Sequence, residues 1–139
     1  MKQSIINTLC AAALLTATHA GAATLTIEVS DVKAAAGNLM VAVFNSPDDF
    51  LKKPANSGSV AAALAGNIVR FQDLPEGDYA FAIYHDANGN GKMDTNLMGI
   101  PTEDYAFSNN AIGKMGPPDY TKAKFALPAA GATLRVTLK

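Results

Sequence analysis

The chain has 139 residues, with eleven Lys and Arg against twelve Asp and Glu, so its formal net charge is −1. Removal of the first 22 residues would take away one lysine and leave about 117 residues with a net charge of about −2. That length suits one domain with a hydrophobic core. The charge signs are mixed and form no basic stripe, which argues against a nucleic-acid partner, because neutralising phosphates requires clustered Lys and Arg.

The N-terminal segment, residues 1–22, is expected to be a secretory signal peptide. Lys2 precedes an uncharged apolar run, and small residues then offer a site for signal peptidase. The run is shorter than the ~20 apolar residues that a transmembrane helix needs. A buried N-terminal helix is the alternative, but no polar face or cap accompanies the run.

Cleavage would leave a single domain, residues 23–139, in the periplasm or outside the cell, without a membrane span. Cys10 is the sole cysteine and lies in the segment removed. No disulfide would therefore constrain the exported fold.

The rest of the chain predicts short β-strands, because polar and apolar residues alternate with a period of two. The expected strands are 24–30, 39–44, 59–64, 68–71, 78–85, 122–127 and 132–138. Turn residues separate them, as in Pro75-Glu76-Gly77. One helical turn is expected at 48–53, and no longer amphipathic helix. The pattern favours an all-β, antiparallel β-sandwich of about seven strands, similar to an immunoglobulin domain.

The segment from Asp86 to Pro118 interrupts this rhythm. More than thirty residues pass there without a convincing strand. Loops of this length in compact domains are commonly functional, or are held by something besides a core.

The first part of that segment matches a calcium loop, D-x-[DN]-x-[DN]-G, with glycine at the sixth position. Calcium takes six to eight oxygen ligands, so the chain must curl closely around the ion. Ligands would come from the side chains of Asp86, Asn88, Asn90 and Asp94 and from the backbone carbonyl of Lys92. We therefore expect a Ca²⁺ site in this loop.

The match is incomplete, because Leu97 stands where an EF-hand carries its bidentate glutamate. Glu103, or alternatively Asp104, would have to complete the site. The expected affinity is weak, of order 10⁻⁴ M, and somewhat tighter if Glu103 or Asp104 joins the site. The alternative is that both Asn-Gly pairs are turn dipeptides that need no metal. Zinc is disfavoured, because the mature chain would hold one histidine and no cysteine.

Four runs resemble a known family and occur in its order. They are Leu74–Asp86, Gly99–Glu103, Tyr105–Asn110 and Gly116–Pro118. Together they are similar to the bacterial exported domain of unknown function 2141 (DUF2141), over essentially the whole mature chain. The resemblance implies a periplasmic or secreted β-sandwich of the transthyretin or prealbumin type, without an assigned activity.

Three functions remain open, and a binding module is favoured. Aromatic residues around the loop, Tyr84, Tyr105, Phe107 and Tyr120, could form a platform for carbohydrate or for a peptide or protein surface, unless the rings close the core instead. The second possibility is a structural protein without a ligand, acting through an exposed strand edge. The third, a hydrolase using His85 and loop carboxylates, is disfavoured because no cysteine or G-x-S-x-G nucleophile is present.

Overall fold

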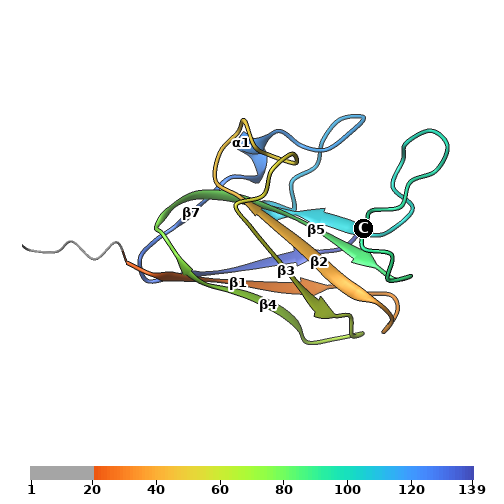
Figure 1. Ribbon diagram of the computed structural model, residues 1–139, viewed down its shortest axis with the longest axis horizontal. Helices are drawn as coiled ribbons and strands as arrows, with labels where there is room; N and C mark the ends of the chain where they lie inside the picture. Colours follow the sequence, from red (N-terminus) through yellow and green to blue (C-terminus); the bar gives the residue numbers. More distant parts are fainter. Residues whose placement is uncertain (1–20) are drawn as a thin grey trace, which may run out of the picture.

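The computed structural model describes residues 21–139, which form two packed β-sheets (Figure 1). The expected signal peptide, residues 1–22, lies almost wholly outside the described residues. The strands are β1 (Ala23–Ser30), β2 (Asn38–Phe44), β3 (Asn56–Ala61), β4 (Asn67–Leu74), β5 (Gly77–Asp86), β6 (Tyr105–Phe107), β7 (Phe125–Leu127) and β8 (Ala132–Thr137). A 3₁₀ turn, η1 (Ser108–Asn110), and a short helix, α1 (Tyr120–Ala123), complete the described elements.

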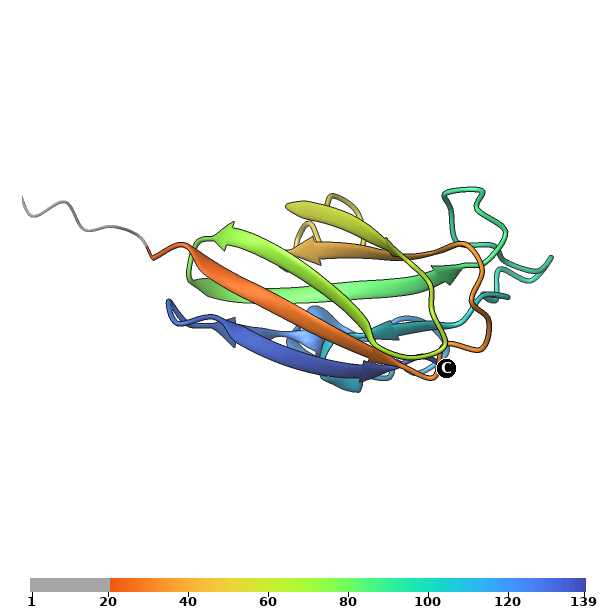
Figure 2. The ribbon, with the colours of Figure 1, turned by 90° about the horizontal axis from the view of Figure 1, so that it is seen from below.

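One sheet has three strands in the order β4-β1-β8, and the other has five, with β3-β2-β5-β6 in order and β7 pairing with β5. Figure 2, seen from below, looks onto the three-stranded sheet, with the five-stranded sheet behind it. The β-sandwich expected from the sequence is therefore confirmed. One pair departs from the antiparallel expectation: β1 and β8 run parallel.

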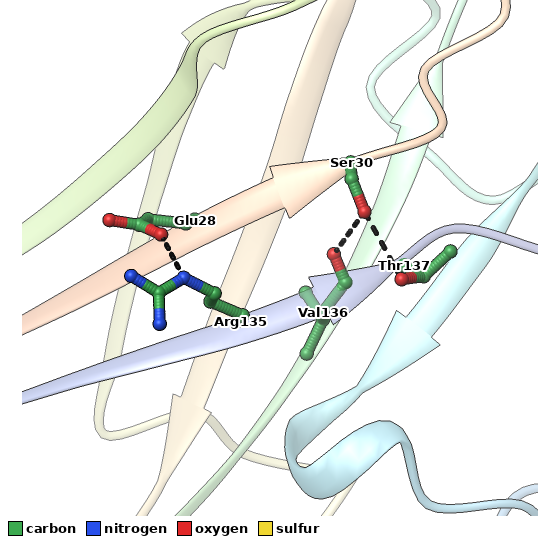
Figure 3. A network of polar contacts seen from close by, with 5 residues as sticks. All are labelled: Glu28, Ser30, Arg135, Val136 and Thr137. Carbon is green, nitrogen blue, oxygen red and sulfur yellow. Dashed lines mark hydrogen bonds and ion pairs between the residues drawn. The ribbon is translucent and has the colours of Figure 1, made fainter.

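Polar side chains link these parallel strands on the outer face of the sheet (Figure 3). Arg135 donates to the carboxylate of Glu28, its register partner, over 2.5 Å. The Ser30 and Thr137 hydroxyls lie 3.1 Å apart. Exposed ion pairs contribute little stability, so the backbone ladder and the inward-facing side chains contribute more to the parallel pairing than this outer network.

The core lies between the sheets and follows the alternation in the sequence. On β5 the side chains of Tyr79, Phe81 and Ile83 are 5%, 0% and 1% exposed, and Leu25 and Ile27 of β1 are both fully buried. Burial of each such side chain contributes about 1.5–3 kcal/mol.

A second apolar cluster packs on the outer face of the five-stranded sheet. Its buried members are Phe44, Phe50, Ala80, Phe107, Tyr120 and Ala123. Phe50 is central, with ring centroids 5.3 Å from Phe44 and 5.6 Å from Tyr120. The cluster covers one end of this face with the loop after β2 and with α1.

Three expectations of secondary structure need correction. The strand expected at 122–127 begins only at Phe125, because Tyr120 and Ala123 pack into the second cluster through α1. The long loop contains a strand that the sequence did not reveal, β6, which pairs with β5. The alanine-rich strand expected at 59–64 lies at 56–61 instead. Within residues 21–139, no helix is long and apolar enough to cross a membrane.

Candidate functional site

Asp86 is the last residue of β5, and the loop is built around its carboxylate. The side chain is 1% exposed. Its two oxygens accept hydrogen bonds from the backbone N–H groups of Asn90, at 3.1 Å, and Gly91, at 2.8 Å. Gly89 and Gly91 have φ of 72° and 78°, a left-handed conformation that glycine adopts at little cost. The chain thus curls tightly about the carboxylate of Asp86.

The two asparagines shape the next turn of the loop. Asn88 Oδ1 accepts the Asn90 backbone N–H, and Asn90 Oδ1 accepts that of Lys92, both at 3.1 Å. Both amide nitrogens donate to Asp94, Asn90 at 2.8 Å and Asn88 at 2.5 Å. These bonds, first from Asn90 and then from Asn88, lower the pKa of Asp94, and the positive charge of Lys92 adds to the effect.

Glu103 returns to this cluster from nine residues further along the chain. Thr102 donates its backbone N–H to the Asp94 carbonyl over 2.9 Å, and Thr95 and Pro101 form a bridge, so the intervening segment folds back on itself. The Asp94 backbone N–H then donates to Glu103 Oε2 over 3.0 Å. Asp104 is directed elsewhere, to a surface ion pair with Lys33 at 2.8 Å. Of the two carboxylates expected to complete the loop, Glu103 is the one that the fold brings to it.

Glu103 also carries an unsatisfied atom. Its Oε1 is buried and has no hydrogen-bond partner among the described residues. A buried carboxylate oxygen without a partner is costly, and a bound cation beside it would remove that cost. The donor chemistry of the loop, carboxylate and amide oxygens with one backbone carbonyl, fits a hard cation such as Ca²⁺.

The carboxylates alone do not form a metal cluster. Within residues 21–139, no group of three or more His, Cys, Asp or Glu side chains is placed to hold a metal. A calcium ion here would therefore depend on the oxygens of Asn88 and Asn90 and the carbonyl of Lys92 as well as on the acidic side chains.

His85 is buried at the end of β5. Its side chain is 4% exposed, and Nε2 lies 2.7 Å from the carbonyl oxygen of Ala36. Both observations agree with a role in packing beside the loop, where it extends the inward-facing series of β5.

An apolar groove adjoins the loop on the outer face of the five-stranded sheet. Tyr84 and Tyr105 are register partners on β5 and β6, and both are half-buried there. Two cavities of about 290 and 410 Å³ share the lining residues Leu51, Ala82, Tyr84 and Met93. Phe107 and Tyr120 are buried in the second apolar cluster, 9% and 8% exposed. The aromatic surface next to the loop therefore consists of Tyr84 and Tyr105.

The fold and loop define a small all-β protein, a sandwich of a three-stranded and a five-stranded sheet with one long structured loop at the end of β5. The chain belongs to the family described as "Uncharacterized protein conserved in bacteria (DUF2141)", whose model matches residues 27–135. The match covers most of both sheets and the entire loop. No curated protein and no solved structure matches the chain.

Proposed function

We propose that this protein is an exported binding module, acting in the periplasm or outside the cell, whose recognition surface is ordered by calcium. The observation that carries the proposal is Glu103, which is brought back to the Asp86 loop and leaves one buried oxygen without a partner. Calcium would be held by the oxygens of Asp86, Asn88, Asn90, Asp94 and Glu103 and by the Lys92 carbonyl.

The surface that this ion would order is the groove beside Tyr84. Tyr84 and Met93 line the groove, and both lie within a few residues of the proposed ligands. Paired tyrosines offer flat apolar faces with a hydroxyl at the edge, which suits the face of a sugar ring or an extended peptide. The ligand class proposed for the groove is therefore carbohydrate or a peptide or protein surface.

The calcium part of the proposal is tested by thermal melts of residues 23–139 in calcium, in magnesium and in excess chelator. A ligand that binds only the folded state stabilises it by about 2.7 kcal/mol at a hundredfold excess over Kd. We expect a rise in Tm that is specific to calcium and is largely lost in Glu103→Gln, which keeps an acceptor for the Asp94 N–H but removes the charge.

Glu76→Gln is the matched control, because Glu76 is an exposed glutamate in the turn between β4 and β5. It should retain the full calcium shift. Identical melts of the unaltered protein in all three buffers would refute the calcium site and favour the alternative of two turn dipeptides.

A further inference from the structure

Exposed apolar side chains are concentrated on two loops of this protein. The large apolar residues that are exposed among residues 21–139 are Leu51, Leu64, Ile68, Leu97, Met98, Ile100, Ile112 and Met115. Five of these eight lie in the loop between β5 and β6 or in the loop between η1 and α1. Single exposed apolar residues are normal, but a gathering of them marks an interaction site.

The two loops are neighbours. Met93, Gly99 and Pro101 from the first and Gly116 and Pro117 from the second line the same cavity of about 290 Å³. Figure 1 shows both loops rising on the side of the sandwich that carries α1. Because the two loops adjoin at this cavity, we treat their apolar tips as one surface, which we call the loop-tip surface and define by the residues Leu97, Met98, Ile100, Ile112 and Met115.

The side chains of the loop-tip surface protrude into solvent. Leu97, Met98 and Met115 are 107%, 83% and 108% exposed. All five members are aliphatic or methionine. The dominant anchors of protein interfaces are aromatic residues and arginine that fill matching pockets, and this surface has neither, although methionine is common to both kinds of surface. Protruding aliphatic chains suit a fluid hydrocarbon phase, which adapts to any shape.

Two lysine side chains lie on the same loops as the apolar tips. Lys92 and Lys114 are exposed, one on each loop, and neither forms a salt bridge with a carboxylate in the described part of the chain. Lysine side chains close to an anionic lipid surface are attracted to it, and this attraction adds to the insertion of neighbouring apolar residues.

The carboxylates of Asp94 and Glu103 oppose this attraction, because they lie in the same loop as Lys92. A calcium ion held by them would cancel much of their negative charge. We infer that, with calcium bound, the loop-tip surface docks onto an anionic lipid surface by inserting its apolar tips between lipid headgroups. The calcium dependence rests on the function proposed above; the apolar and cationic surface does not.

The test is co-sedimentation of the protein, residues 23–139, with vesicles. Vesicles of phosphatidylcholine that contain phosphatidylglycerol are compared with vesicles of pure phosphatidylcholine, each in calcium and in chelator. We expect binding to the anionic vesicles in calcium, with less binding in chelator and at high salt. The double variant Leu97→Ser/Met98→Ser should weaken apparent binding to the vesicles by roughly tenfold or more. The reason is that the apolar surface of two side chains is no longer buried in the lipid.

Leu64→Ser is the matched control, because Leu64 is 66% exposed, about as much as Ile112 at 65%, but lies in the turn between β3 and β4. It should bind as the unaltered protein does. Melts of each variant in calcium and in chelator show whether the fold and the calcium shift survive.

Several results would overturn the inference. The first is the absence of vesicle binding in calcium. The second is vesicle binding by the double variant that equals that of the unaltered protein. The third is a loss of vesicle binding in Leu64→Ser that equals the loss in the double variant. Self-association that the double variant abolishes would also overturn the inference, since the tips would then form a protein interface. A calcium shift in Tm without vesicle binding refutes the docking and leaves the calcium loop standing. Vesicle binding that is indifferent to calcium, together with an absent shift, refutes the calcium loop and the calcium dependence of docking.

Discussion

Glu103 Oε2 accepts the backbone N–H of Asp94 over 3.0 Å, which joins two residues that are nine positions apart. This bond closes the loop into a compact unit with Asp86 at its base and leaves Glu103 Oε1 buried without a partner. A glutamate held in this way is already aimed at the loop, so an arriving cation would not have to reposition it, and this preorganisation reduces the entropic cost of binding. We expect calcium to change the electrostatics of the loop as well as to order the groove beside it.

Tyr84 should report that electrostatic change. Burial raises the pKa of its phenol, and the negative charges of Asp86, Glu103 and Asp94 raise it further. A bound calcium ion would offset those charges and bring the pKa of Tyr84 closer to its ordinary value of 10.0. We expect the tyrosinate absorbance titration to shift to lower pH in calcium but not in magnesium, and Tyr84→Phe to abolish the shift. A titration that calcium leaves unchanged would contradict an ion at this loop.

Asp94 should make the calcium-free protein sensitive to acid. Hydrogen bonds from Asn90 and Asn88 hold its pKa below the ordinary value of 3.8. A carboxyl whose pKa is lowered in the folded state stabilises the fold above its ordinary pKa, and this stability is lost as the pH falls through the lowered value. In chelator, the urea concentration at the unfolding midpoint should therefore decrease as the pH is lowered through that range. The decrease should be smaller in Asp94→Asn than in the unaltered protein. The difference will be small, because the side chain is solvated; an equal acid dependence in both would refute the assignment.

Most of the sandwich could be predicted because its strands are amphipathic. The alternation of Tyr79, Phe81 and Ile83 fixes the inner face of β5, and their burial confirms it. The parallel pairing of β1 and β8 could not be predicted, because alternation specifies which face a strand buries and not which neighbour it takes.

The site was predictable only in its local part. Asp86 and Asn90 lie within one short motif, so their convergence around the turn follows from spacing. Proximity in the sequence indicates Glu103 as a further ligand, with Asp104 as an equal alternative. The choice between them depends on the fold, because the strand pairing that leads into β6 directs Asp104 to Lys33. The strand β6 itself was missed, because a three-residue strand is too short to show a period.

Gly37 should be irreplaceable for a reason that involves the loop. Its φ is +64°, and an added Cβ would lie 1.9 Å from the carbonyl oxygen of Asp86. Gly66 has a similar φ of +75° but nothing within 4 Å of a Cβ, so it isolates the cost of the backbone conformation, about 1–2 kcal/mol. Gly37→Ala should lower Tm well beyond Gly66→Ala, and it should also diminish the calcium shift, because Asp86 must move. Equal effects of the two variants would show that the close approach has no energetic consequence.

Ser108 should be a polar anchor of the fold, even though it lies in the segment that the sequence left without structure. It is fully buried, its Oγ accepts the Phe81 backbone N–H at 3.0 Å, and its hydroxyl donates to the Ala123 carbonyl at 2.5 Å. It thus ties β5 to α1. Ser108→Ala would leave both backbone groups buried and unpaired, at a cost of about 1–3 kcal/mol for each.

We therefore expect a loss of about 2 kcal/mol or more in the free energy of unfolding of Ser108→Ala, measured by urea titration with tyrosine fluorescence. Ser59→Ala, on the exposed face of β3, is the matched control and should stay within about 0.5 kcal/mol of the unaltered protein. Similar midpoints for Ser108→Ala and Ser59→Ala would mean that water replaces the hydroxyl, and that the other contacts of α1, such as the packing of Tyr120 against Phe50, are sufficient to hold it.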